Sequence, residues 1–336
     1  MGGDIDLGQN GGYSTTYSSY LTIPGSYALA GENIFKEAGC NQTSVEAQIA
    51  CLKAVPAVTL NAFGNVARYV VQDGTFVNTE QLDVSNRNGS TAFVPTMFGT
   101  CHDDGASIGA TYPTTPVTSE VAGIEASLGI SAYYAQEIIN SGLFPLYNTG
   151  NLILDSFNVS ARVSTDRGFR CIDQATMYAG AVTGAFAASY YYVQDRTIGG
   201  YDPNNLGGPP IKPGYPNGDP NLPYFRVHSG ATAPFIFGNV SPIRDPDDLH
   251  AAQLNSGYFA QFVKDGQPNP SERYLQKRGY TTTLEAVEQT GRWASIRGSD
   301  GPIRLLDYPS TESGFLDVPQ CAFLNYSLNY YLEGGS

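Results

Sequence analysis

The sequence has few charged residues and no long apolar run. Only 15% of its 336 residues are charged, three are histidine and one is tryptophan. No stretch approaches the roughly 20 apolar residues that span a bilayer. The first 20 residues lack the basic and apolar segments of a signal peptide. We therefore expect no transmembrane segment and no signal peptide in this chain.

Basic residues are also scarce relative to acidic ones. The formal net charge is -13 and the pI is near 4.5. A phosphate backbone requires a basic surface, so this balance argues against nucleic acid and anionic membranes as partners. Hydrophobic residues make up 41% of the chain, with 38 glycines and 21 prolines. This composition is typical of a globular protein with many loops.

The five cysteines form neither a Cys-x-x-Cys motif nor a Cys/His cluster. A structural zinc site is therefore not expected, and nothing in the sequence calls for another metal or a cofactor. Cys40 and Cys51 flank a short polar loop between two predicted helices. They are candidates for a local disulfide in an oxidising compartment, and buried reduced cysteines are the alternative. The odd number leaves at least one thiol outside any pairing within the chain.

The pattern of helices and strands favours the α/β class. We predict strands near residues 69–74, 93–99 and 190–193, and helices near residues 28–36, 44–53, 119–139, 166–188 and 251–262, with polar helical character over 273–297. Residues 1–27 read as poorly structured or as a truncated edge, and residues 28–336 as one domain. The Gly- and Pro-rich stretch 198–225 is either a linker or, in our preferred interpretation, a structured loop beside a site.

The chemistry-bearing residues appear in the order acid, then histidine. Asp103 and Asp104 follow an apolar strand candidate, and His228 lies far downstream before an apolar run, residues 234–239. This order matches the acid and base of α/β-hydrolase triads. Paired acids before glycine also commonly end a strand in a solvated turn, and a lone histidine is more often structural. Of the other histidines, His250 belongs to a charged surface turn, and His102 is badly placed to face Asp104.

No serine upstream of these residues fits the nucleophile of such a triad. Residues 105–109 match Gly-x-Ser-x-Gly, but a charged turn precedes them and a Pro-containing segment follows. A nucleophile elbow requires a buried strand before the serine and a helix after it. We therefore do not expect Ser107 to be the nucleophile.

Several separated segments together resemble the type B carboxylesterase/lipase family, which includes the cholinesterases. They are residues 38–53, 73–77, 99–105, 169–175, 223–239 and 320–322. The chain is similar to the C-terminal portion of a fungal-type carboxylesterase from about residue 28 to residue 331. The resemblance implies Asp104 as the triad acid, His228 as the general base, and a Cys171–Cys321 bridge that leaves Cys101 free.

The resemblance has three departures. The family usually has glutamate where Asp104 stands. The histidine loop is one residue longer, with Ala231 in place of a usual glutamate. The family's first half, which carries the oxyanion glycines and the nucleophile elbow, is absent, so the resemblance implies a partial α/β-hydrolase fold whose mostly parallel sheet lacks its N-terminal strands.

The function expected from this resemblance is hydrolysis of a small-molecule or lipid carboxylic ester. His228 and Asp104 would come from this chain, and the missing N-terminal half would supply the serine, without which the chain should be nearly inactive. A non-catalytic binding or adhesion module on the same fold is the alternative, and a chain that does not fold stably is a third. The resemblance also implies a secreted glycoprotein in full-length form, with which five Asn-x-Ser/Thr sequons agree, although a similar number is expected by chance.

Overall fold

The computed structural model describes residues 21–64, 71–78, 82–198, 225–228, 232–240 and 246–334. The chain forms two compact units, one of residues 4–83 and one that includes residues 84–336. The sequence shows no compositional break at this boundary. The Gly- and Pro-rich stretch 198–225 lies almost entirely outside the described residues.

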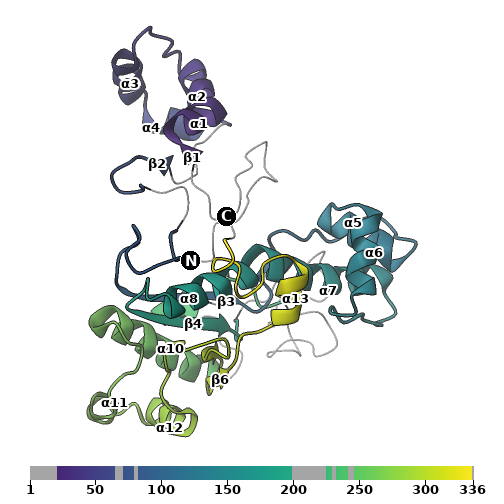
Figure 1. Ribbon diagram of the computed structural model, residues 1–336, viewed down its shortest axis with the longest axis vertical. Helices are drawn as coiled ribbons and strands as arrows, with labels where there is room; N and C mark the ends of the chain where they lie inside the picture. Colours follow the sequence, from purple (N-terminus) through teal and green to yellow (C-terminus); the bar gives the residue numbers. More distant parts are fainter. Residues whose placement is uncertain are drawn as a thin grey trace. The chain divides into compact units, whose positions relative to one another are not determined.

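The first unit combines short helices with a two-stranded parallel sheet (purple to blue in Figure 1). Its elements are β1 (Leu21–Thr22), α1 (Ile23–Ser26), the π-helical turn η1 (Tyr27–Gly31), α2 (Glu32–Glu37), α3 (Val45–Ala54), α4 (Ala57–Asn61) and β2 (Val71–Gln72). The Ser44 hydroxyl accepts the Ala47 N–H at 3.2 Å and caps α3. A Cys40–Cys51 disulfide joins the loop after α2 to α3, so the two helices and the bridge predicted here are present.

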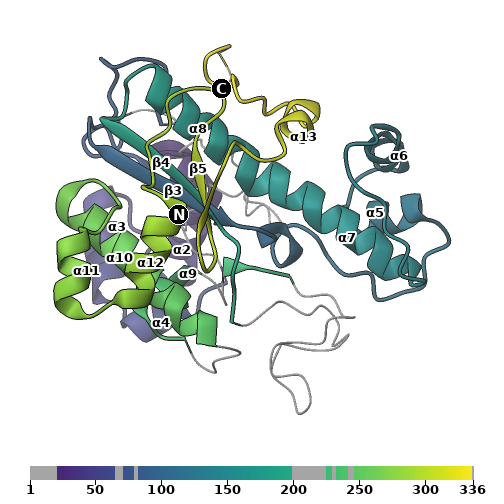
Figure 2. The same cartoon turned by 90° about the horizontal axis from the view of Figure 1, so that it is seen from below.

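The second unit is built on a mostly parallel sheet with the order β3-β4-β5-β6. Strands β3 (Pro95–Cys101), β4 (Ala188–Gln194) and β5 (Ile303–Leu306) are parallel, and β6 (Thr311–Ser313) is antiparallel to β5. Figure 2 shows α8 on one side of the sheet and α10 and α12 on the other. The predicted α/β class is therefore confirmed at the level of a mostly parallel sheet flanked by helices.

The aromatic run in β4 explains how both faces of this sheet are covered. Successive strand side chains point to opposite faces. Tyr190 and Tyr192 pack against Trp293 and Tyr258, with ring centroids 5.4–6.3 Å apart within this group. Tyr191, on the opposite face, is fully buried. Burial on both faces is typical of parallel strands between two helical layers.

A long helical rod connects β3 with β4. It consists of α7 (Leu152–Thr165), the π-helical turn η3 (Asp166–Arg170) and α8 (Cys171–Val182). The helix predicted within residues 166–188 is present as η3 and α8, but the prediction missed that the rod already begins at residue 152. In α7 the Ser156, Ser160 and Thr165 hydroxyls donate to carbonyls one turn earlier. Serine and threonine ordinarily favour turns and helix ends. Within α7 these hydrogen bonds give their hydroxyl groups partners inside the helix.

The remaining helices pack around the rod and the sheet. They are α5 (Glu120–Leu128), α6 (Ala132–Asn140), α9 (Thr232–Phe237), α10 (Pro246–Asp265), α11 (Glu272–Arg278), α12 (Thr281–Thr290) and α13 (Val318–Phe323). The single helix predicted over 119–139 is wrong, since Gly129 adopts φ 64° and ends α5. The helical character predicted over 273–297 is confirmed only as far as Thr290. No helix within the described ranges is long and apolar enough to cross a membrane.

The C-terminal segment is tied to the rod. A Cys171–Cys321 disulfide joins the first residue of α8 to α13, as the resemblance implied. The Gln174 side chain donates to the Leu316 carbonyl and accepts the Leu316 N–H, both at 2.8 Å. Because Cys171 directly follows η3, these contacts anchor the segment beside the π-helical turn.

Candidate active site

The carboxyl ends of β3 and β4 lie at the same edge of the sheet. Cys101, the last residue of β3, is paired in register with Gln194, the last residue of β4. Loops held by a rigid scaffold commonly carry binding and catalytic residues. The chain leaves β3 into a turn with two carboxylates, Asp103 and Asp104, and leaves β4 at a third, Asp195.

Asp104 is buried at the start of η2 (Asp104–Ala106), a single 3₁₀ turn. Its Oδ2 accepts the Cys101 N–H at 2.8 Å, and its Oδ1 accepts the His228 N–H at 2.9 Å. Each carboxylate oxygen therefore has a backbone donor, one from the strand that precedes it and one from a segment 124 residues away. A buried carboxylate requires such partners.

The His228 ring completes this pair. Its Nδ1 lies 3.5 Å from Asp104 Oδ1, and 55% of the side chain is exposed. The hydrogen bond to Asp104 raises the pKa of His228 above that of an ordinary histidine, against the effect of burial. With Nδ1 facing the carboxylate, Nε2 has no partner among the described residues. The ring thus has the orientation of a general base supported by an acid, with a separation at the loose end of the range seen in unliganded sites.

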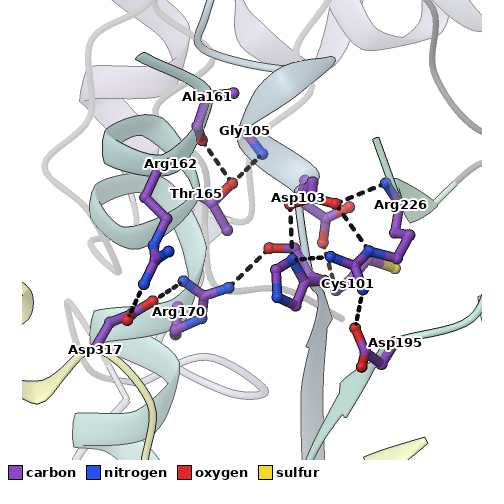
Figure 3. Close-up of polar contacts among 12 residues, drawn as sticks. Cys101, Asp103, Gly105, Ala161, Arg162, Thr165, Arg170, Asp195, Arg226 and Asp317 are labelled. Atoms are coloured by element: carbon purple, nitrogen blue, oxygen red, sulfur yellow. Dashed lines mark hydrogen bonds and ion pairs between the residues drawn. The ribbon is translucent and has the colours of Figure 1, made fainter. Parts of the chain in front are cut away.

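The turn that carries Asp104 rests on the helical rod. Figure 3 shows Gly105 donating its N–H to the Thr165 hydroxyl, which donates in turn to the Ala161 carbonyl, at 3.0 and 2.8 Å. A Cβ added at Gly105 would lie 2.1 Å from the Thr165 nitrogen. Only glycine permits this approach, so the position of the acid is set by contact with α7.

Asp103 forms a second cluster beside the first. Its Oδ2 accepts the Arg226 N–H at 2.9 Å and the Arg226 Nε–H at 3.1 Å, while the Asp103 N–H donates to the Arg226 carbonyl at 2.9 Å. The Arg226 guanidinium also pairs with Asp195. Nδ1 of His102 lies 2.7 Å from Asp103 Oδ1 and 2.9 Å from Arg226 Nη2. Burial would raise the pKa of Asp103, but His102 and Arg226 together hold it well below its usual range.

A third cluster links this edge of the sheet to the π-helical turn. Arg170 is fully buried, pairs with Asp166, and donates to the His102 carbonyl at 2.8 Å. It also pairs with Asp317 (Figure 3). Asp317, just before α13, also pairs with Arg162. π-helical turns often occur at functional sites, and here the turn places Arg170 within reach of both Asp166 and Asp317. The spacing of Asp166 and Arg170, one helical turn apart, is the sequence signal for this ion pair.

The other residues considered from the sequence occupy different settings. His250 lies in the first turns of α10 and is partly exposed, with its ring 5.0 Å from that of Tyr308, so the predicted turn at this position was wrong. The Ser107 hydroxyl donates to the Asp104 carbonyl within its own turn. Cys101 is free and buried, with its sulfur 3.3 Å from the Thr232 hydroxyl. Ala231 lies outside the described residues.

The described residues contain no serine hydroxyl bonded to His228 and no cluster of three or more residues that would hold a metal ion. No protein-family model matches the chain, and no curated protein matches it. The arrangement at the sheet edge is therefore the principal basis for a functional hypothesis.

Proposed function

We propose that this chain supplies the acid and the histidine of a carboxylic-ester hydrolase of the serine type. Asp104 orients His228, and His228 acts as general base and then as general acid. The nucleophile and the oxyanion donors would come from a polypeptide segment other than the described residues. The substrate would be a small-molecule or lipid ester.

The single observation that carries this proposal is the Asp104–His228 pair. The acid follows β3, and the histidine comes after β4, the adjacent parallel strand. The carboxylate is buried and fully hydrogen-bonded, while Nε2 of the ring faces away from it. Proton transfer by such a pair requires an acid whose position is fixed and a base whose free nitrogen is accessible. On this proposal the sheet is the C-terminal part of an α/β-hydrolase fold.

The first test is hydrolysis of a p-nitrophenyl ester by the purified chain and its variants. Without its nucleophile the chain should act only as a weak base that activates water. We expect His228→Gln to lower the protein-dependent rate by about 10²-fold, the lower limit for general-base catalysis. Asp104→Asn should lower it as well.

His250→Gln is the matched control. His250 Nδ1 lies 3.6 Å from Asp247 Oδ1, so it is also a partly exposed histidine beside a carboxylate, on α10. This variant should keep the wild-type rate. If His228→Gln also keeps the wild-type rate, the proposal is overturned and a non-catalytic binding module on this fold becomes the better explanation.

Fluorophosphonate labelling tests where the nucleophile lies. No stoichiometric serine adduct is expected on the folded chain, because no described serine contacts His228. An adduct that forms on the wild type and is lost in His228→Gln would support the hydrolase but overturn our placement of the nucleophile. Peptide mapping would then identify that serine.

A further inference from the structure

Residues 225–228, here called the histidine segment, are held to the turn after β3, here called the acid turn. The contacts are made by two successive carboxylates of that turn, Asp103 and Asp104. Asp103 accepts the N–H of Arg226, and Asp104 accepts the N–H of His228. The two donors are two residues apart, and burial alternates along residues 225–228, with Arg226 and His228 on the more exposed side. Asp103 and Asp104 therefore bind this segment at two consecutive positions along the same side.

The intervening residues face the core. Phe225 and Val227 are buried in the cluster that contains Phe157 and Ala106, and the rings of Phe225 and Phe157 lie 5.3 Å apart. Ala106 belongs to the same 3₁₀ turn as Asp104. The apolar and polar sides of the histidine segment therefore both attach to structure immediately next to the acid.

The Arg226 side chain adds a cross-link that the backbone contacts cannot supply. Its guanidinium reaches Asp103 after β3, Asp195 after β4, and the ring of His102. A planar guanidinium with several N–H donors can bridge such partners, whereas an ammonium group concentrates its charge at one point. Arg226 thus joins the ends of two adjacent strands to the segment that carries His228.

We propose that Arg226 is a positioning residue, which through Asp103 and Asp195 fixes the histidine segment so that the His228 ring faces Asp104. This inference rests on the proposed function and adds to it a residue that acts through another. Without the cross-link, the segment keeps its three hydrogen bonds from main-chain groups to Asp103 and Asp104 but loses its attachment to the end of β4. The His228 ring is more than half exposed, so few packing contacts hold the ring itself against the Asp104 carboxylate. Its orientation therefore depends on the position of the histidine segment.

The decisive measurement is an NMR titration of the histidine Cε1–H resonances in the full chain. Only three histidines are present, and single His→Gln variants assign each of them. In the wild type, contact with Asp104 raises the pKa of His228. In Arg226→Met we expect that pKa to fall back toward about 6.5, the ordinary histidine value. A pure loss of positive charge would instead raise it, so the direction separates positioning from charge.

Arg162→Met is the matched control, because the Arg162 and Arg226 side chains are 28% and 30% exposed and each pairs with carboxylates. It should leave the His228 titration unchanged. Arg226→Lys, the milder variant, keeps the charge but not the bridge and should lower the pKa in the same direction. An unchanged or raised His228 pKa in both Arg226 variants would overturn the proposal.

Asp104→Asn separates this inference from the proposed function. If Asp104→Asn does not lower the His228 pKa, the acid–histidine pair itself is refuted, and the proposed function fails with it. If Asp104→Asn lowers that pKa and the Arg226 variants do not, only the positioning role fails.

Discussion

The backbone nitrogen of Gly105 lies 3.0 Å from the hydroxyl of Thr165, so the turn that carries the acid sits directly on the helical rod. Van der Waals contact here is between main chains, because a Cβ at Gly105 would lie 2.1 Å from the Thr165 nitrogen and 2.8 Å from the Ala161 oxygen. A backbone neighbour cannot rotate away as a side chain does. The acid turn and the rod are therefore expected to move as one body.

Gly105→Ala should destabilise the second unit by about 1–3 kcal/mol or more, the range for forced overpacking. Urea denaturation followed by the fluorescence of the single Trp293 measures this, because Trp293 lies in the core of that unit. Gly168→Ala is the control, since a Cβ there meets nothing within 4 Å. It should stay within about 1 kcal/mol of the wild type. Equal stabilities of the two variants would contradict the close contact.

Local sequence patterns predicted the elements that local physics determines. The apolar strand before the acid turn and the aromatic run of β4 follow from residue type, because apolar and aromatic side chains favour strands. The break at Gly129 did not, because an isolated glycine inside a helical pattern does not by itself end a helix. The start of the rod was missed because serine-rich segments ordinarily indicate weak helix formers.

The candidate site could likewise be predicted only in part from the sequence. The order of Asp104 and His228 could be read along the chain, and their contact remained an expectation until the fold was known. The long-range partners of Arg226 and Arg170 could not be predicted in this way. Asp103 lies 123 residues from Arg226, and Asp317 lies 147 residues from Arg170. Such pairs depend on strand order and on the path of the rod, which periodicity does not reveal.

The pairing of His228 with Asp104 predicts a pH-dependent contribution to stability. The folded-state pKa of His228 is raised by its hydrogen bond to Asp104. This contribution is therefore fully present below the unfolded-state value of about 6.5, and it is lost as the pH rises through the folded-state pKa. Because the ring is exposed to solvent, the contribution of this pair to the free energy of unfolding should stay below about 1 kcal/mol.

Thermal melts of the wild type and His228→Gln measure this contribution. The difference in melting temperature should be larger at about pH 5.5 than at about pH 8.5. In an Asp104→Asn background the pH dependence of that difference should disappear, because the two changes remove the same interaction. A difference that is constant with pH, or one that persists in the Asp104→Asn background, would show that the two side chains are not coupled.

The cysteines provide a test of both units that requires no activity assay. Cys101 is buried at the end of β3, and burial is the main cause that raises its thiol pKa well above the usual value. The thiolate is the nucleophile that attacks thiol reagents, so Cys101, buried and with a raised thiol pKa, should react very slowly in the native chain. In urea without reductant, one equivalent of thiol should appear, because the other four cysteines form the Cys40–Cys51 and Cys171–Cys321 bridges. Cys101→Ala should remove that equivalent, and peptide mapping without reduction should recover both bridges. Rapid labelling of Cys101 in the native chain would mean that the strand end beside Asp104 is open to solvent, in conflict with the buried carboxylate on which the proposed acid–histidine pair depends.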